Sequence, residues 1–206
     1  MSVFSRIIAG EIPGRFVWAD DVCVAIGTHE PIADGHVLVI PREEVARFTD
    51  LDDVAFAHVS VVAKHIGNAQ IRAFGVPRAM AVIAGLEVPH VHVHVIPARS
   101  EEDIVFANAR AGLPAEALDA PMERLRQALR QEGWGDFVPE GMHSLRCRPG
   151  SSRATRVEAR IFERLRATSQ EPSHDPAAAT TVLARQRALG RRDPAAFRSE
   201  PGPPRR

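Results

Sequence analysis

Apolar residues follow two different periods along the first half of the chain. Near the N-terminus they recur at helical spacing, and Gly10 follows them, so we predict a short helix that ends at this glycine; its apolar positions are Val3, Phe4, Ile7 and Ile8. Strand-like apolar runs then cover residues 15–18, 22–28 and 36–41. The turn signals Asp20-Asp21 and Asp34-Gly35 separate these runs. The pattern predicts three antiparallel strands.

The longest helical pattern covers residues 52–74. Apolar residues mark one face of it, at Ala55, Phe56, Val59, Val62, Ala63, Ile66 and Ala73. Asp50 or Asp52 is available as the N-cap, and Gly75-Val76-Pro77 ends the helix. Two more strand-like runs follow, at residues 79–84 and 90–96. This order predicts an α+β fold with about five antiparallel strands, one long helix and the short N-terminal helix.

Composition changes near residue 135. Residues 1–135 contain 12 Lys and Arg against 18 Asp and Glu, whereas the remainder contains 14 against 8. Eight of the 16 prolines lie beyond residue 135. We therefore expect a main domain at residues 1–110, a helical C-terminal segment of that domain at 111–135, and an Arg/Pro-rich tail at 136–206. We predict that the tail is mostly disordered and does not share the core, because so polar a segment buries too little surface to offset its chain entropy.

Charge and cysteine content exclude several classes of protein. The basic residues of the tail are spread out without interleaved aromatic residues, so we expect no specific nucleic-acid binding. Cys23 and Cys147 form neither a disulfide framework nor a Cys-x-x-Cys site. The first ten residues lack the pattern of a signal peptide, and no apolar stretch reaches membrane-spanning length. We therefore predict a cytoplasmic protein without a membrane partner.

Three histidines alternate with valines in the run at residues 90–96. On a β-strand His90, His92 and His94 share one face, so the period predicts a solvent-facing row of imidazoles above valines that point into the core. Residues two apart on a strand are separated by about 6.6 to 6.8 Å, within reach of one small anion or one metal ion. The same pattern also fits a surface strand that merely carries histidines.

The alternating histidines fit two kinds of chemistry. Histidines two residues apart are a common part of three-histidine zinc sites, but no acidic residue closely follows His94, so His36 would have to be the extra ligand. Alternatively, an imidazole that is largely neutral at pH 7 attacks phosphorus directly and yields a phosphoramidate that water later cleaves.

The run at residues 88–97, VPHVHVHVIP, resembles the His-φ-His-φ-His-φ-φ signature of the histidine triad superfamily, where φ is an apolar residue. Residues 4–13 (FSRIIAGEIP), 20–25 and 35–41 (GHVLVIP) resemble the family's other segments in order and spacing. The resemblance covers about residues 2–110 and nothing in the tail.

This resemblance implies an α+β homodimer that binds purine nucleotides and hydrolyses or transfers them at the α-phosphate. On this match His92 is the nucleophile and forms a nucleotidyl-histidine intermediate. His90 and His94 are the flanking triad members, and His36 approaches from a neighbouring strand. The family roles of these three are phosphate contact, proton supply and positioning, and we assign the general acid to His94. The matched nucleotide-binding positions are Thr28, Gly85, Leu86, Glu87, His92 and His94.

The expected substrate is a nucleoside phosphoramidate, an aminoacyl-adenylate or a dinucleoside polyphosphate, with AMP as the product. Residues 98–114 are expected to border the leaving-group side. No cofactor and no metal are expected. Some family members hold zinc with a Cys-x-x-Cys pair and a further histidine, but this chain has Ser2, Ser5 and Glu44 at those places.

The match departs from the family pattern at two places. Many members have an acidic residue that contacts the ribose hydroxyls where this chain has Thr28, which predicts weaker nucleoside affinity. The common Gly-Gln-Ser/Thr-Val run is here Gly85-Leu86-Glu87-Val88. Leu86 cannot donate a hydrogen bond, and Glu87 repels a phosphate unless it faces solvent or pairs with a cation such as His36 or His90.

Two alternatives to nucleophilic histidine catalysis are also open. One is an AMP-binding regulatory protein with little or no catalysis. The other is a metal-dependent hydrolase that uses His90, His92 and His36.

Overall fold

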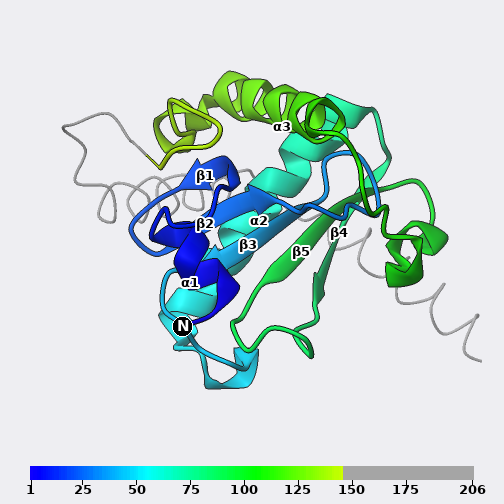
Figure 1. Ribbon diagram of the computed structural model, residues 1–206. Coiled ribbons are helices and arrows are strands. Elements are labelled where there is room, and N and C mark those ends of the chain that lie inside the picture. The colour runs from blue at the N-terminus through cyan, green and yellow to red at the C-terminus, as the bar shows by residue number, and fades with distance from the viewer. Residues whose placement is uncertain (146–206) are drawn as a thin grey trace, which may run out of the picture. The chain divides into compact units, whose positions relative to one another are not determined.

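The computed structural model describes residues 1–145, and the predicted tail from residue 146 onward lies outside the described residues. One antiparallel sheet has the strand order β1-β2-β3-β5-β4 (Figure 1). Its strands are β1 Arg15–Ala19, β2 Cys23–Gly27, β3 Val37–Pro41, β4 Arg78–Ile83 and β5 Val93–Ala98. The predicted α+β fold with five antiparallel strands is confirmed. Because β5 lies between β3 and β4, the strand that carries His94 is an interior one.

In the described part of the chain three α-helices accompany the sheet: α1 Val3–Ile8, α2 Asp53–Phe74 and α3 Ala115–Leu129. Shorter helical turns lie at Phe48–Asp50, Glu101–Ile104, Phe106–Asn108, Arg130–Trp134 and Gly135–Phe137. Asp52, rather than Asp50, caps α2 by accepting hydrogen bonds from the Val54 and Ala55 amides. Gly75 ends α2 in the left-handed conformation at a φ of 59°. No helix within residues 1–145 is long and apolar enough to cross a membrane, and the cytoplasmic location stays a prediction.

The sheet has a core on each face, because alternate residues of a strand point to opposite sides. Val37 and Val39 of β3 pack in the larger cluster, beneath α2 and α3. Leu38 and Ile40 pack in the smaller cluster together with Phe4 of α1. Figure 1 accordingly has α1 and α2 on opposite sides of the sheet.

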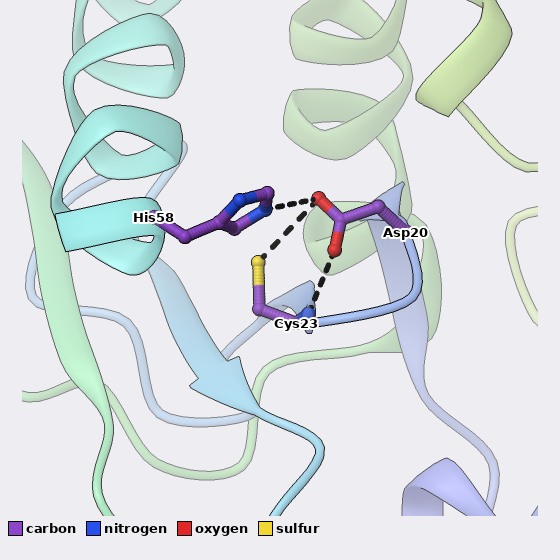
Figure 2. Close-up of side chains that lie close together, drawn as sticks. All are labelled: Asp20, Cys23 and His58. Carbon is purple, nitrogen blue, oxygen red and sulfur yellow. Dashed lines mark hydrogen bonds and ion pairs between the residues drawn. The ribbon is translucent and has the colours of Figure 1, made fainter. Parts of the chain in front are cut away.

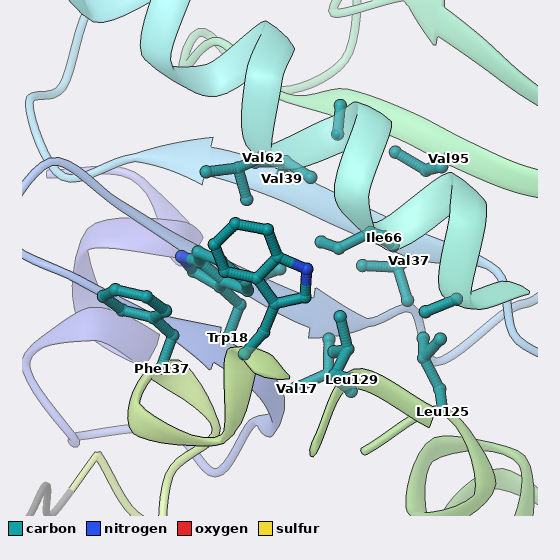
Figure 3. Close-up of a cluster of buried hydrophobic side chains, with 14 of the residues drawn as sticks. Val17, Trp18, Val37, Val39, Val62, Ile66, Val95, Leu125, Leu129 and Phe137 are labelled. Carbon is teal, nitrogen blue, oxygen red and sulfur yellow. The ribbon is translucent and has the colours of Figure 1, made fainter. Parts of the chain in front are cut away.

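The larger core extends past residue 135, so the predicted boundary there is wrong. Phe137 is 1% exposed and stacks on Trp18 with ring centroids 4.7 Å apart (Figure 3). Val138 is buried in the same cluster. The buried guanidinium of Arg126 also donates hydrogen bonds to the carbonyls of Phe16 and Pro139, each at 2.6 Å. Specific aromatic packing and this buried arginine therefore hold a segment that its average composition assigns to the tail.

Candidate active site: a cluster of four histidines

The four predicted histidines lie together, but not as one row on a strand. His94 is on β5 and His36 immediately precedes β3, whereas His90 and His92 belong to the loop that leads into β5. His90 is 0% and His92 7% exposed, so the predicted solvent-facing row is wrong. The pairing of β5 with β3 extends only over Val93 to Val95, which leaves the preceding residues free to turn their rings toward backbone carbonyls.

A chain of hydrogen bonds fixes the protons of His36 and His94. The backbone N–H of Ile32 donates to Nδ1 of His36 at 3.2 Å, so that nitrogen holds a lone pair and Nε2 holds the proton. Nε2 of His36 therefore donates to Nδ1 of His94 at 3.0 Å. His94 consequently carries its own proton on Nε2, which has no acceptor among the described residues.

Both of these imidazoles are neutral at pH 7. Burial, with a smaller contribution from His94, lowers the pKa of His36 to about 3. Burial, with a smaller contribution from His92, lowers the pKa of His94 to about 4. The pair is therefore a hydrogen-bonded unit without a net charge until an anion binds beside it.

His92 has the opposite arrangement of proton and lone pair. Its Nδ1 lies 2.8 Å from the carbonyl oxygen of His90, and because a carbonyl only accepts, Nδ1 carries the proton. The lone pair is therefore on Nε2, which has no partner within residues 1–145. Burial lowers the pKa of His92, which keeps the ring neutral. The ring of Phe4 packs edge-on against it with centroids 5.0 Å apart.

His90 uses both of its ring nitrogens within the protein. Nε2 donates to the carbonyl of Pro41 at 2.8 Å, and Nδ1 accepts from the hydroxyl of Ser2 at 2.7 Å. No ring nitrogen is left for a substrate, so this side chain orients the backbone carbonyl that holds His92. Ser2 is also the N-cap of α1, which links that helix to the site.

The other predicted nucleotide-binding positions divide into two groups. A Cβ at Gly85 would lie 3.9 Å from Cε1 of His92, so this glycine borders the ring. The Thr28 amide donates to the carbonyl of His36 at 3.3 Å, so Thr28 also borders the cluster. Leu86 and Glu87 are instead exposed. The alternative in which Glu87 pairs with His36 or His90 is wrong, because both rings are bonded to other groups.

Phe106 is a site residue that the sequence did not single out. Its ring stands perpendicular to that of His94 with centroids 4.9 Å apart, and the side chain is 43% exposed. Arg110 holds the loop after Phe106 against the segment before His36. Its amide donates to the Pro31 carbonyl at 3.2 Å, and its guanidinium donates to the Asp34 carboxylate at 2.7 Å. An exposed apolar residue in a loop has no periodic signal in the sequence. Phe106 was therefore included only in the expectation that residues 98–114 border the leaving-group side.

Asp20, Cys23 and His58 form a second cluster with metal-ligand chemistry (Figure 2). Oδ2 of Asp20 accepts from Nε2 of His58 at 2.9 Å and Nε1 of Trp18 at 2.7 Å, and it lies 3.7 Å from Sγ of Cys23. Oδ1 accepts from the Val22 and Cys23 amides. The carboxylate is thus fully occupied by donors and has no lone pair left for a metal ion.

The charges of this cluster agree with a hydrogen-bonding role. Burial raises the pKa of the Cys23 thiol well above its usual value, so it is not a thiolate ligand. Burial alone would raise the pKa of Asp20, but the hydrogen bond and charge of His58, together with the hydrogen bonds from Trp18 and the Cys23 amide, outweigh it and the pKa is lowered. The cluster joins the β1–β2 turn to α2.

Ser2, Ser5 and Glu44 also do not fit a zinc ion. Oε2 of Glu44 accepts from the amide of Ser2 at 2.8 Å and from the hydroxyl of Ser5. The hydroxyl of Ser2 is bonded to His90. Two serine hydroxyls replace the sulfur ligands that zinc prefers, and they are hydrogen-bonded within the protein.

Comparison with known proteins agrees with this geometry. The family model of the HIT domain matches residues 9–101. An uncharacterized HIT-like protein of Borreliella burgdorferi is 36% identical over 102 residues, which cover 46% of this chain and 73% of that protein. The chain belongs to the HIT family. Another relative, the adenosine 5′-monophosphoramidase of Saccharomyces cerevisiae, is 31% identical over 118 residues, 57% of this chain and 72% of that one.

A solved HIT structure has the same fold. It is a Zn-bound histidine triad family protein from Mycobacterium smegmatis, with a TM-score of 0.57 and 25% identity. The alignment covers 65% of this chain and 96% of that chain. A more distant sequence relative is the adenylylsulfatase of Arabidopsis thaliana, 28% identical over 134 residues, 63% of this chain and 68% of the relative.

Proposed function

We propose that this HIT protein is a hydrolase or transferase that acts at the α-phosphate of a purine nucleotide conjugate. The observation that carries the proposal is the free Nε2 lone pair of His92, which the carbonyl of His90 keeps unprotonated. The names of the yeast and plant relatives, a phosphoramidase and an adenylylsulfatase, support the same class of reaction.

The first step is a displacement at phosphorus. Nε2 of His92 attacks, a P–N bond forms, and the bond from phosphorus to the leaving group breaks. The anionic substrate favours one added proton on the His36–His94 pair. His94 gives its Nε2 proton to the leaving group, and the pair returns to its neutral form. The carbonyl of His90 accepts a hydrogen bond from Nδ1 of His92 and so stabilises the positive charge that the substituted ring acquires.

The second step regenerates the enzyme. Water adds its oxygen to phosphorus and its proton returns to His94, while the P–N bond breaks and its electron pair returns to Nε2 of His92. The product is the nucleoside monophosphate, AMP for an adenosine substrate. If an alcohol or amine replaces water, the same step is a transfer.

The nucleoside is proposed to bind beside α1. Phe4 contacts the ring of His92 and belongs to the apolar cluster of that face of the sheet, together with Ile7, Ile26 and Leu38. Phe4, Ile26 and Leu38 are buried, so the partly buried Ile7 is the member of this group that offers a flat purine an apolar surface. Thr28 offers the ribose one hydroxyl instead of a carboxylate, so we expect modest affinity for AMP.

A second copy of the chain is the proposed partner. Within residues 1–145 β4 is an edge strand, so no described strand pairs with one side of its backbone. A groove beside it is lined mostly by small and apolar residues, among them Gly67, Ile71, Ala79, Met80 and Ile83, and also by Ser60, Lys64 and Asn68. Sedimentation of the wild-type protein should give the mass of two chains and Met80→Glu the mass of one. A monomeric wild-type protein would contradict this proposal.

The decisive assay measures AMP release from an adenosine phosphoramidate and from a diadenosine polyphosphate. We expect wild-type turnover that survives EDTA treatment and falls about 10⁴-fold or more in His92→Ala. His143→Ala, which removes a half-exposed histidine outside the cluster, is the matched control. Equal rates in wild type and His92→Ala would reject the mechanism, and loss of activity with EDTA would favour a metal-dependent hydrolase.

A regulatory AMP-binding protein is the second candidate. The exposed positions of Leu86 and Glu87 favour it, because neither side chain supplies a hydrogen-bond donor to a phosphate. Calorimetric titration with AMP separates the two. Saturable AMP binding without turnover of either substrate would support the regulatory function.

A further inference from the structure

Gln70 is a fully buried polar residue on α2 that reaches the two strands of the histidine cluster. Its Nε2 donates one hydrogen bond to the carbonyl of Gly35 at 2.8 Å and another to the carbonyl of Val95 at 2.9 Å. Gly35 immediately precedes His36, and Val95 immediately follows His94. The side chain therefore joins the two backbone segments that carry the hydrogen-bonded imidazoles.

The orientation of this amide is not ambiguous. Both of its near partners are carbonyl oxygens, which only accept, so the NH₂ group must face them. Oε1 then points the other way, and among the described residues it is buried without a hydrogen-bond partner. A buried acceptor without a partner has a free-energy penalty. The two donated bonds offset this penalty and tie α2 to both backbone segments.

The backbone that Gln70 holds on the His36 side is unusual. Gly35 has a φ of 92°, a conformation that favours glycine, and the ring of Phe74 packs so close that a Cβ would collide with it. The turn is thus tightly enclosed between α2 and the sheet. The direction of the Gly35 carbonyl, and with it the backbone that leads into His36, therefore depends on Gln70 and Phe74 of α2.

We propose that Gln70 is a positioning residue that holds the His36–His94 pair in register for proton donation to the leaving group. The inference rests on the proposed function for its catalytic consequence. It acts through the backbone and not through substrate contact. A displacement of about 1 Å in a reacting group can lower a rate about 100-fold, so the loss of this clamp should be visible in turnover.

The test compares Gln70→Met, which keeps the length but removes both donors, with Ile66→Val, a mild change in the buried face of the same helix. For Gln70→Met we expect kcat to fall about 10- to 100-fold while the Kd for AMP changes less than about twofold. Histidine ¹⁵N shifts at pH 7.5 should give a single Nε2–H form of His94 in the wild type and a mixture of tautomers in the variant. Ile66→Val should change neither property.

Three outcomes would overturn the proposal. Gln70→Met could lower the melting temperature but leave kcat and the His94 tautomer unchanged, which would make Gln70 merely structural. If Gln70→Met does not fold, Gln70→Asn takes its place, and a wild-type kcat in that variant has the same meaning. Absence of scalar coupling across the Gln70–Gly35 and Gln70–Val95 hydrogen bonds in the wild type would also reject the clamp. If the wild type turns over neither substrate, the proposed function fails, but the tautomer comparison still decides the role of Gln70.

Discussion

The Nδ1–H group of His92 donates a hydrogen bond to the carbonyl oxygen of His90, two residues earlier, across 2.8 Å. The geometry is local, but it exists because the His90 ring is itself held at both nitrogens by Pro41 and Ser2. A buried neutral imidazole with its lone pair turned outward is the result. The proposed reactivity of His92 thus depends on Pro41 and Ser2, which contact the His90 ring and not that of His92.

Ser2→Ala should weaken both stability and turnover. The substitution removes the α1 N-cap, which costs about 1 kcal/mol, and leaves Nδ1 of buried His90 without its donor, which costs about 1–3 kcal/mol. Urea denaturation measures the loss, and AMP release measures the effect on kcat. Ser60→Ala, which removes an exposed hydroxyl bonded within α2, should change both by much less. Identical behaviour of the two variants would contradict the role of Ser2.

Stability should fall as the pH drops from about 6.5 toward 4. The pKa values of His36 and His94 are about 3 and about 4 in the folded protein, below the ordinary 6.5. The unfolded chain therefore binds more protons in this interval. The contribution of the two neutral histidines to the free energy of unfolding is complete above pH 6.5 and is lost on acidification. Urea midpoints at several pH values measure the slope. His94→Gln should make this pH slope shallower, and an unchanged slope would mean that the pKa of His94 is not lowered in the folded protein.

Asp20→Asn should destabilise the protein by about 1–3 kcal/mol for each buried donor left without its acceptor, because the carboxylate accepts hydrogen bonds from His58 and Trp18. The new amide would also turn an NH₂ group toward donors that now share a carboxylate. Urea denaturation checks this against Asp50→Asn, a largely exposed carboxylate paired with Arg47. A metal site would behave differently, since added zinc would then stabilise the wild type and not the variant.

Phe137→Ala should cost about 3–5 kcal/mol, as expected for a large side chain removed from a core. The control is Phe48→Ala, which truncates a phenylalanine that is 47% exposed. Thermal unfolding of both variants tests whether the domain includes the segment after residue 135. Equal stability of the two variants would support a domain boundary at residue 135, as the composition alone predicts.

Local patterns were sufficient for most of the secondary structure. The period of apolar residues predicted α1 and α2, and the cap at Asp52 and the glycine at Gly75 follow from backbone geometry that depends on near neighbours. The histidine run was likewise visible because its residues are adjacent in the chain. Sequence reasoning therefore reached His90, His92 and His94 as a group.

Contacts between distant residues were decided only by the tertiary structure. His36 and His94 are 58 residues apart, and Gln70 joins their strands from a helix. The two-residue periodicity of a strand indicates which residues share a face, but not where pairing with the next strand stops. It therefore could not place His90 and His92 in a buried loop. Composition averages over a segment, whereas Phe137 is buried by one specific aromatic stack with Trp18. The sequence by itself determined which chemistry is present, and the three-dimensional packing decided which nitrogen of each imidazole holds a proton, because that depends on the carbonyl or amide that lies beside it.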